Sequence, residues 1–299
     1  LKMRNKELKY VQTWTIIMVF FITIKVCSAE TSKDSLSKEL NSIFLNWSSS
    51  MNNQNLEKWR DTTANFRKVG IRNMIVSQKK KWPESLFESP VSPPKIDSMK
   101  MVKLMLNGPT AQLVYFGQPD FGISKEVETP EGLLFLMFVK ENEGWKFGTS
   151  RFMNLNNTEE ITASAKSGDF SFLDSPQFKP PGKLPEVAKL CPVPEMVGYL
   201  EIISIGYETT VSVEERSTHR VINNVHKGLI LGGLKKGINQ LFIEARSIKS
   251  DPRKEPGKPH LEINVYTESK QDKKPLKKIY GTGLKKGPSK FKIIVRGDV

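Results

Sequence analysis

The chain has few of the side chains that perform most protein chemistry near neutral pH, with three histidines and two cysteines among its 299 residues. Two cysteines are too few for a disulfide framework. The three histidines are spread over more than forty positions, without the close pairs that zinc sites use. No histidine precedes His219, so the preceding residues have no imidazole for acid–base catalysis. We therefore predict no catalytic residue, no cofactor and no metal ion, and we lean against an enzyme.

Long apolar runs are also missing, because none reaches the roughly 20 residues that a membrane-spanning helix needs. The run within residues 14–24 is short, follows a basic start and precedes the small residues Ser28 and Ala29. This pattern predicts a signal peptide over residues 1–29, cleaved after Ala29, and export to a periplasm or out of the cell. The alternative is an inner-membrane anchor formed by residues 10–29.

Acidic residues are scarce in the last part of the chain. Residues 181–299 hold 22 basic and 13 acidic residues, a net charge of +9, whereas residues 30–180 are nearly balanced. Solvated turns without a partner are the first explanation of this charge, and for an exported protein the alternative is contact with an anionic envelope polymer. Nucleic acid is not expected, because few aromatic residues lie between the lysines. The candidate contact residues are Lys235, Lys236, Lys285 and Lys286.

The residues after the predicted signal peptide show first a helical and then a strand periodicity. Apolar residues from Leu36 to Trp47 recur at steps of three and four, which predicts a helix, and shorter helices are expected over 55–64 and 66–77. Alternating or continuous apolar runs then predict strands, and the run 133–139 is typical of a strand buried on both faces. Helices followed by an antiparallel meander indicate an α+β domain over residues 30–156.

The segment from Leu133 to Leu155, with Gly144-Trp145-Lys146-Phe147 after an acidic turn, resembles the nuclear transport factor two-like superfamily, which includes the SnoaL-like and ketosteroid isomerase-like proteins. The resemblance covers roughly residues 35–155. It implies a cone-like domain of three helices packed on a curved antiparallel sheet that encloses a pocket, used either for catalysis or for binding alone. The expected pocket residues are Trp59, Asp61, Arg67, Tyr115 and Arg151.

An isomerase-like reaction would need a carboxylate base facing that pocket, with a partner such as Tyr115. Asp61 and Glu57 are the candidates, but their spacing also suits a solvated helix face. Core packing explains the tryptophans equally well. These alternatives stay open at the level of sequence.

Prolines crowd the region after the first domain, so we expect a linker over residues 157–195 that contains at most a short helix. Short alternating segments from residue 196 onwards predict an all-β sandwich domain over 196–299. Within it, Gly233-Leu234-Lys235-Lys236-Gly237 recurs as residues 283–287, which suggests a turn with positive φ at a glycine and the leucine tucked beneath.

The sequence thus predicts an exported bacterial protein of two domains that serves as a non-enzymatic binding or cell-envelope-associated module. The alternative is a small-ligand-binding or isomerase-like enzyme that uses the pocket of the first domain. The expected partner is a small apolar ligand or an anionic envelope polymer, with membrane contact only through an uncleaved signal peptide.

Overall fold

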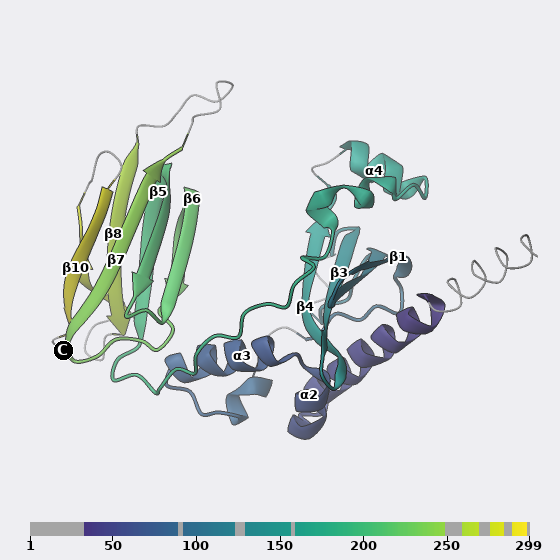
Figure 1. Cartoon of the computed structure of the whole chain (residues 1–299), viewed down its shortest axis with the longest axis horizontal. Helices are drawn as coiled ribbons and strands as arrows, with labels where there is room; N and C mark the ends of the chain where they lie inside the picture. Colours follow the sequence, from purple (N-terminus) through teal and green to yellow (C-terminus); the bar gives the residue numbers. More distant parts are fainter. Residues whose placement is uncertain are drawn as a thin grey trace, which may run out of the picture. The chain divides into compact units, whose positions relative to one another are not determined.

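The computed structural model describes residues 33–88, 92–122, 129–156, 159–248, 259–268, 276–283 and 289–297. These residues form two compact units (Figure 1). The first unit draws on Leu1–Ala64 and Pro90–Pro185, and the second on Asn65–Ser89 and Glu186–Val299. The predicted signal peptide, residues 1–29, lies outside the described residues. Within the described ranges, no helix is long and apolar enough to cross a membrane.

The first unit is built on an antiparallel meander whose strands lie in chain order. The strands are β1 (Lys100–Asn107), β2 (Thr110–Gly117), β3 (Gly132–Glu141) and β4 (Gly144–Asn154). Residues 33–52 are helical, and α2 (Leu56–Thr62) follows, capped by the Asn55 side chain. The predicted helices and strands of this unit are therefore confirmed in position.

Both faces of this sheet are covered. On one face, Phe44 and Trp47 of the helix 33–52 pack against Phe147 of β4, with ring centroids 5.3 and 4.4 Å apart. On the other face, Phe135 of β3 stacks with Phe178 at 5.9 Å. Phe178 belongs to a segment that contains α4 (Glu159–Lys166) and the 3-10 turns η2 (Ser171–Asp174) and η3 (Pro176–Phe178). The continuous apolar run of β3 is thus explained, because the strand is buried on both sides.

The predicted cone of three helices on one curved sheet is wrong, because the third helix belongs to the second unit. This helix, α3 (Asn65–Ser77), is followed by the 3-10 turn η1 (Glu84–Phe87). Its buried Asn73 accepts a hydrogen bond from the Cys191 backbone N–H at 2.9 Å and donates one to the Lys189 carbonyl at 2.8 Å. Polar side chains therefore hold the proline-rich segment against α3, a role that apolar periodicity does not reveal.

The second unit contains one six-stranded antiparallel sheet in place of the predicted sandwich of two sheets. Its order is β10-β7-β5-β8-β9, and β6 pairs with the other edge of β5. The strands are β5 (Gly198–Val213), β6 (Ser217–Leu229), β7 (Gly237–Ser247), β8 (His260–Glu268), β9 (Leu276–Gly281) and β10 (Ser289–Gly297). The coarser prediction, a β-rich antiparallel unit, holds.

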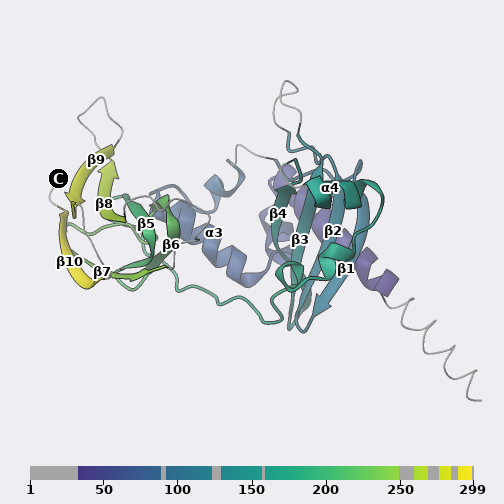
Figure 2. The same cartoon turned by 90° about the horizontal axis from the view of Figure 1, so that it is seen from above.

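The sheet can enclose a core by itself because β5 and β6 are bent. The first part of β5 pairs with β8 and the second part with β7, while β6 follows β5 along both parts, with a register shift between Ser204 and Glu208. The sheet has two wings, one formed by β8 and β9 and the other by β7 and β10. These wings curl toward each other until β9 and β10 approach, so the sheet is almost a barrel (Figure 2). Its interior holds one apolar cluster that includes Leu200, Val211 and Ile263.

Candidate functional site

A cleft of about 480 Å³ lies in the first unit, between the helix 33–52 and the strands β1 and β2. Its buried lining includes Ile96, Met99 and Tyr115, and exposed Leu45 and Met101 add apolar surface at its edge. Charged side chains also line it, namely Asp34, Lys38 and Asp97, and all three are exposed. The cleft therefore combines an apolar floor with a charged rim, which is the usual make-up of a small-molecule site.

Tyr115 is the polar group on the floor of this cleft. Its partner in the β1–β2 register is Met101, so both side chains point to the helix-covered face. The Tyr115 hydroxyl donates a hydrogen bond to Asn41 Oδ1 at 2.9 Å, and burial raises the pKa of Tyr115 to about 12. The phenol is therefore protonated at neutral pH. The Asn41 side chain also belongs to the lining of the cleft.

The other residues predicted for the pocket do not join Tyr115. Trp59 is 1% exposed and belongs to the core beneath α2. Asp61 is exposed at the end of α2, where its backbone carbonyl accepts a hydrogen bond from Lys146 Nζ at 2.6 Å. Glu57 is likewise exposed. Neither candidate base lines the cleft.

The two predicted arginines also lie elsewhere. Arg151 pairs with Phe135 across β3 and β4, and its guanidinium sits 4.8 Å from the Phe135 ring centroid. This is the face opposite Tyr115, because Phe135 packs with the cluster under α4. Arg67 is part of α3 in the second unit, and burial lowers its pKa to about 10. Tyr115 is thus the one predicted pocket residue that the cleft contains.

Sequence reasoning missed Asn41, Ile96, Met99 and Met101 as cleft residues. Met99 and Met101 do alternate along the chain, but their contact with Tyr115 depends on the register of β1 against β2. Asn41 lies beside the buried stripe of its helix, where an exposed polar residue is the default expectation. No local pattern distinguishes it from the neighbouring surface residues.

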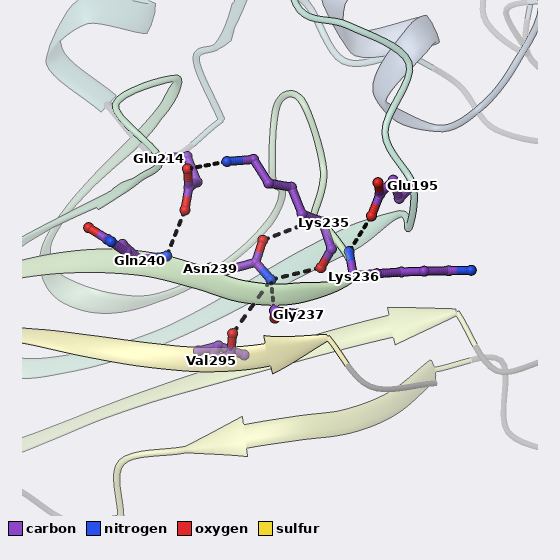
Figure 3. A network of polar contacts seen from close by, with 8 residues as sticks. All are labelled: Glu195, Glu214, Lys235, Lys236, Gly237, Asn239, Gln240 and Val295. Atoms are coloured by element: carbon purple, nitrogen blue, oxygen red, sulfur yellow. Dashed lines mark hydrogen bonds and ion pairs between the residues drawn. The ribbon is translucent and has the colours of Figure 1, made fainter.

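Two of the four lysines predicted to contact an anionic surface, Lys235 and Lys236, lie in the turn drawn in Figure 3. Lys235 Nζ forms an ion pair with Glu214 at 2.8 Å, and the Lys236 backbone N–H donates to the Glu195 carboxylate, while the Lys236 side chain extends away from the network. Lys235 thus has an internal partner. Lys285 and Lys286 lie outside the described residues, so the anionic-polymer contact stays a prediction.

The turn itself has the predicted form. Gly233 and Gly237 have φ of 58° and 83°, and Leu234 is 1% exposed. A Cβ on Gly233 would lie 2.4 Å from the Pro194 Cβ, so this glycine is needed both for its backbone conformation and for space.

Comparison with known proteins gives no relative. No family model matches the chain, and neither the curated proteins nor the solved structures include a match. The resemblance to the nuclear transport factor two-like superfamily therefore stays a prediction.

Proposed function

We propose that the protein is a binding protein whose first unit takes a small, mainly apolar molecule with one hydrogen-bonding group into the cleft above Tyr115. The observation that carries this proposal is the Tyr115–Asn41 pair beside the buried apolar side chains of Ile96 and Met99. Such a pair offers an acceptor on the phenol oxygen and donors on the amide, and the apolar surface around it supplies the affinity.

The arrangement favours binding over an isomerase-like reaction. A proton-abstracting enzyme needs a carboxylate held within hydrogen-bond reach of its substrate. The carboxylates that line this cleft, Asp34 and Asp97, are exposed on its rim, and α2 keeps Glu57 and Asp61 outside the lining. Tyr115 keeps its proton, so it can orient a bound polar group as a donor or acceptor.

Export is the second part of the proposal, and it rests on residues 1–29. A protein that binds small molecules outside the cytoplasm, either free or held at the inner membrane, fits this leader. Amino-terminal sequencing of the protein purified from its source tests it, because cleavage after Ala29 is expected and an intact leader would indicate the anchored alternative.

The binding proposal is tested with N-phenyl-1-naphthylamine, a fluorescent molecule with an apolar body and a single N–H donor. We expect its fluorescence to rise saturably with the protein. Met101→Glu places a carboxylate at the edge of the cleft and should weaken the affinity at least about tenfold, or about 1.4 kcal/mol. Tyr115→Phe should weaken it less, because the apolar floor remains.

Met74→Glu is the matched control, since Met74 of α3 is 47% exposed and Met101 is 42% exposed. Probe binding should be unchanged in this variant. Equal effects of the two glutamate variants, or no saturable binding by the unaltered protein, would overturn the proposal.

A further inference from the structure

Two of the three histidines lie side by side in the second unit. His219 Nδ1 is 3.1 Å from His226 Nε2, and the ring centroids are 5.3 Å apart. Both residues belong to β6, and the bend that β6 shares with β5 brings its two halves together. The rings are half-buried, so water reaches them. Their separation along the chain had pointed away from any such pair.

The orientation of the His219 ring is fixed through the nitrogen that does not face His226. Its Nε2 lies 2.9 Å from the hydroxyl of Ser217, which is 2% exposed. The same hydroxyl accepts a hydrogen bond from the Leu231 backbone N–H at 3.0 Å. The Ser217 hydroxyl thus holds the His219 ring through its Nε2 edge, with Nδ1 facing His226.

Gly228 makes room for the second ring. A Cβ at this position would lie 2.6 Å from His226 Nε2 and 3.1 Å from His219 Cε1. The backbone therefore comes close to both rings at the point where their nitrogens meet. A side chain at residue 228 would therefore have to displace the end of the His226 ring.

The two facing nitrogens are suited to share a cation when each presents a lone pair. We propose that His219 Nδ1 and His226 Nε2 bind one divalent metal ion that prefers imidazole ligands, Zn²⁺ or Cu²⁺, with water in its remaining positions. This inference concerns the second unit and does not depend on the function proposed for the cleft.

The distance between the nitrogens fits this assignment. With metal–nitrogen bonds of about 2.0–2.1 Å, nitrogens 3.1 Å apart subtend an angle of roughly 100° at the metal. That value lies between the angles of square-planar and tetrahedral coordination, which are the geometries of Cu²⁺ and Zn²⁺.

Among the described residues, no cluster of three or more His, Cys, Asp or Glu side chains is suited to hold a metal. Two protein ligands and water then predict micromolar rather than nanomolar affinity.

Zn²⁺ titration of the full chain, after treatment with a chelator, tests the proposal. Calorimetry should detect one equivalent bound with micromolar affinity. His219→Gln and His226→Gln should each lower that affinity at least about tenfold, and Ser217→Ala should lower it about tenfold through loss of the group that orients His219. His260→Gln is the matched control, because His260 lies on β8 beside Glu262, at 3.6 Å, and should leave binding unchanged.

A measurement on the unaltered protein tests the proposal even if the variants fold poorly. In long-range ¹H–¹⁵N spectra, Zn²⁺ should move the resonances of His219 Nδ1 and His226 Nε2 and leave those of His260 in place. Absence of a one-equivalent site overturns the proposal, as does a shift confined to His260 or undiminished binding in the folded His219→Gln and His226→Gln variants.

Discussion

The side chain of Asn223 accepts a hydrogen bond through Oδ1 from the backbone N–H of Gly206 at 2.9 Å, across the bend of the β5–β6 hairpin. Both residues have positive φ, 78° at Gly206 and 46° at Asn223. Glycine and asparagine are the residues that adopt this conformation at least cost. The bond therefore holds the corner at which one sheet turns into two wings, and the same corner brings His219 beside His226.

Asn223→Ala should destabilise the second unit by about 1–2 kcal/mol, because it removes the bond to Gly206 and puts a β-carbon with poor preference for positive φ at the bend. Asn223→Gly should cost less, since it restores the backbone freedom without the bond. Urea unfolding followed by a probe in the second unit measures both. Asn224→Ala, at the next exposed position, should change stability by less than about 0.5 kcal/mol, and an equal loss there would contradict the assigned role.

Asn73→Ala should expose the thiol of Cys191. The substitution leaves the buried Cys191 N–H without the acceptor that Asn73 provides, at a cost of about 2 kcal/mol, which corresponds to roughly 30-fold easier local opening. The measurement is the rate of reaction with a disulfide reagent in a Cys27→Ser background. Burial raises the pKa of Cys191, so the unaltered thiol should react slowly at pH 8.

The control for that experiment is Gln78→Ala, which removes only an exposed side-chain hydrogen bond to the Met74 carbonyl. Its thiol should react at the rate of the unaltered protein. Rapid labelling before any substitution would show that the Asn73 contacts do not protect Cys191.

Asn239→Ala should destabilise the second unit far more than Lys235→Ala. Asn239 is 0% exposed, accepts a hydrogen bond from the Lys235 backbone N–H at 2.8 Å and donates one to the Lys235 carbonyl at 2.9 Å, which closes the turn of Figure 3. Its loss should cost about 2–3 kcal/mol. The Lys235 side chain of the Lys235–Glu214 ion pair is half-exposed, so the pair should contribute less than about 1 kcal/mol. Thermal unfolding of the two variants compares them directly, and the reverse order would be evidence against this account.

Stability of the second unit should fall with pH below 6.5 in a way that depends on His219. Burial lowers the pKa of His219 to about 4 in the folded chain, so the unfolded chain binds this proton first as the pH falls. The contribution is complete above the unfolded pKa of about 6.5 and is lost between there and about 4. Urea unfolding at pH 7.5 and 5.0 in the presence of a chelator should show a smaller loss for His219→Gln than for the unaltered protein. Identical pH dependence in the two proteins would contradict the shifted pKa.

Much of the secondary structure follows from local periodicity. The steps between Leu40, Phe44 and Trp47 predicted a helix, and all three side chains are buried. The prediction of short strands from residue 196 onwards was wrong for β5, for an equally local reason. The buried positions of β5 are even-numbered before Gly206 and odd-numbered after it. Because the alternation changes phase at the bend, the sequence of this one strand has the pattern of two strands joined by a turn.

The candidate site was less predictable. Tyr115 was expected in a pocket, yet its neighbours in the cleft come from the helix 33–52 and from β1, and the expected partners Trp59, Asp61 and Arg151 point elsewhere. The type of a residue predicts which chemical groups it offers. The register between strands decides which other side chains lie beside it.

The order of side chains along each segment determined where the helices and most strands form, that the run 133–139 is buried on both faces and that the Gly233–Gly237 turn tucks Leu234 inward. These features depend on neighbours a few positions apart. Only the tertiary structure decided that α3 joins the second unit, that one bent sheet replaces a sandwich, and that His219 meets His226. Each of these depends on contacts between residues that the bend of β5 and β6 or the path of the proline-rich segment brings together, and such contacts leave no periodic trace in the sequence.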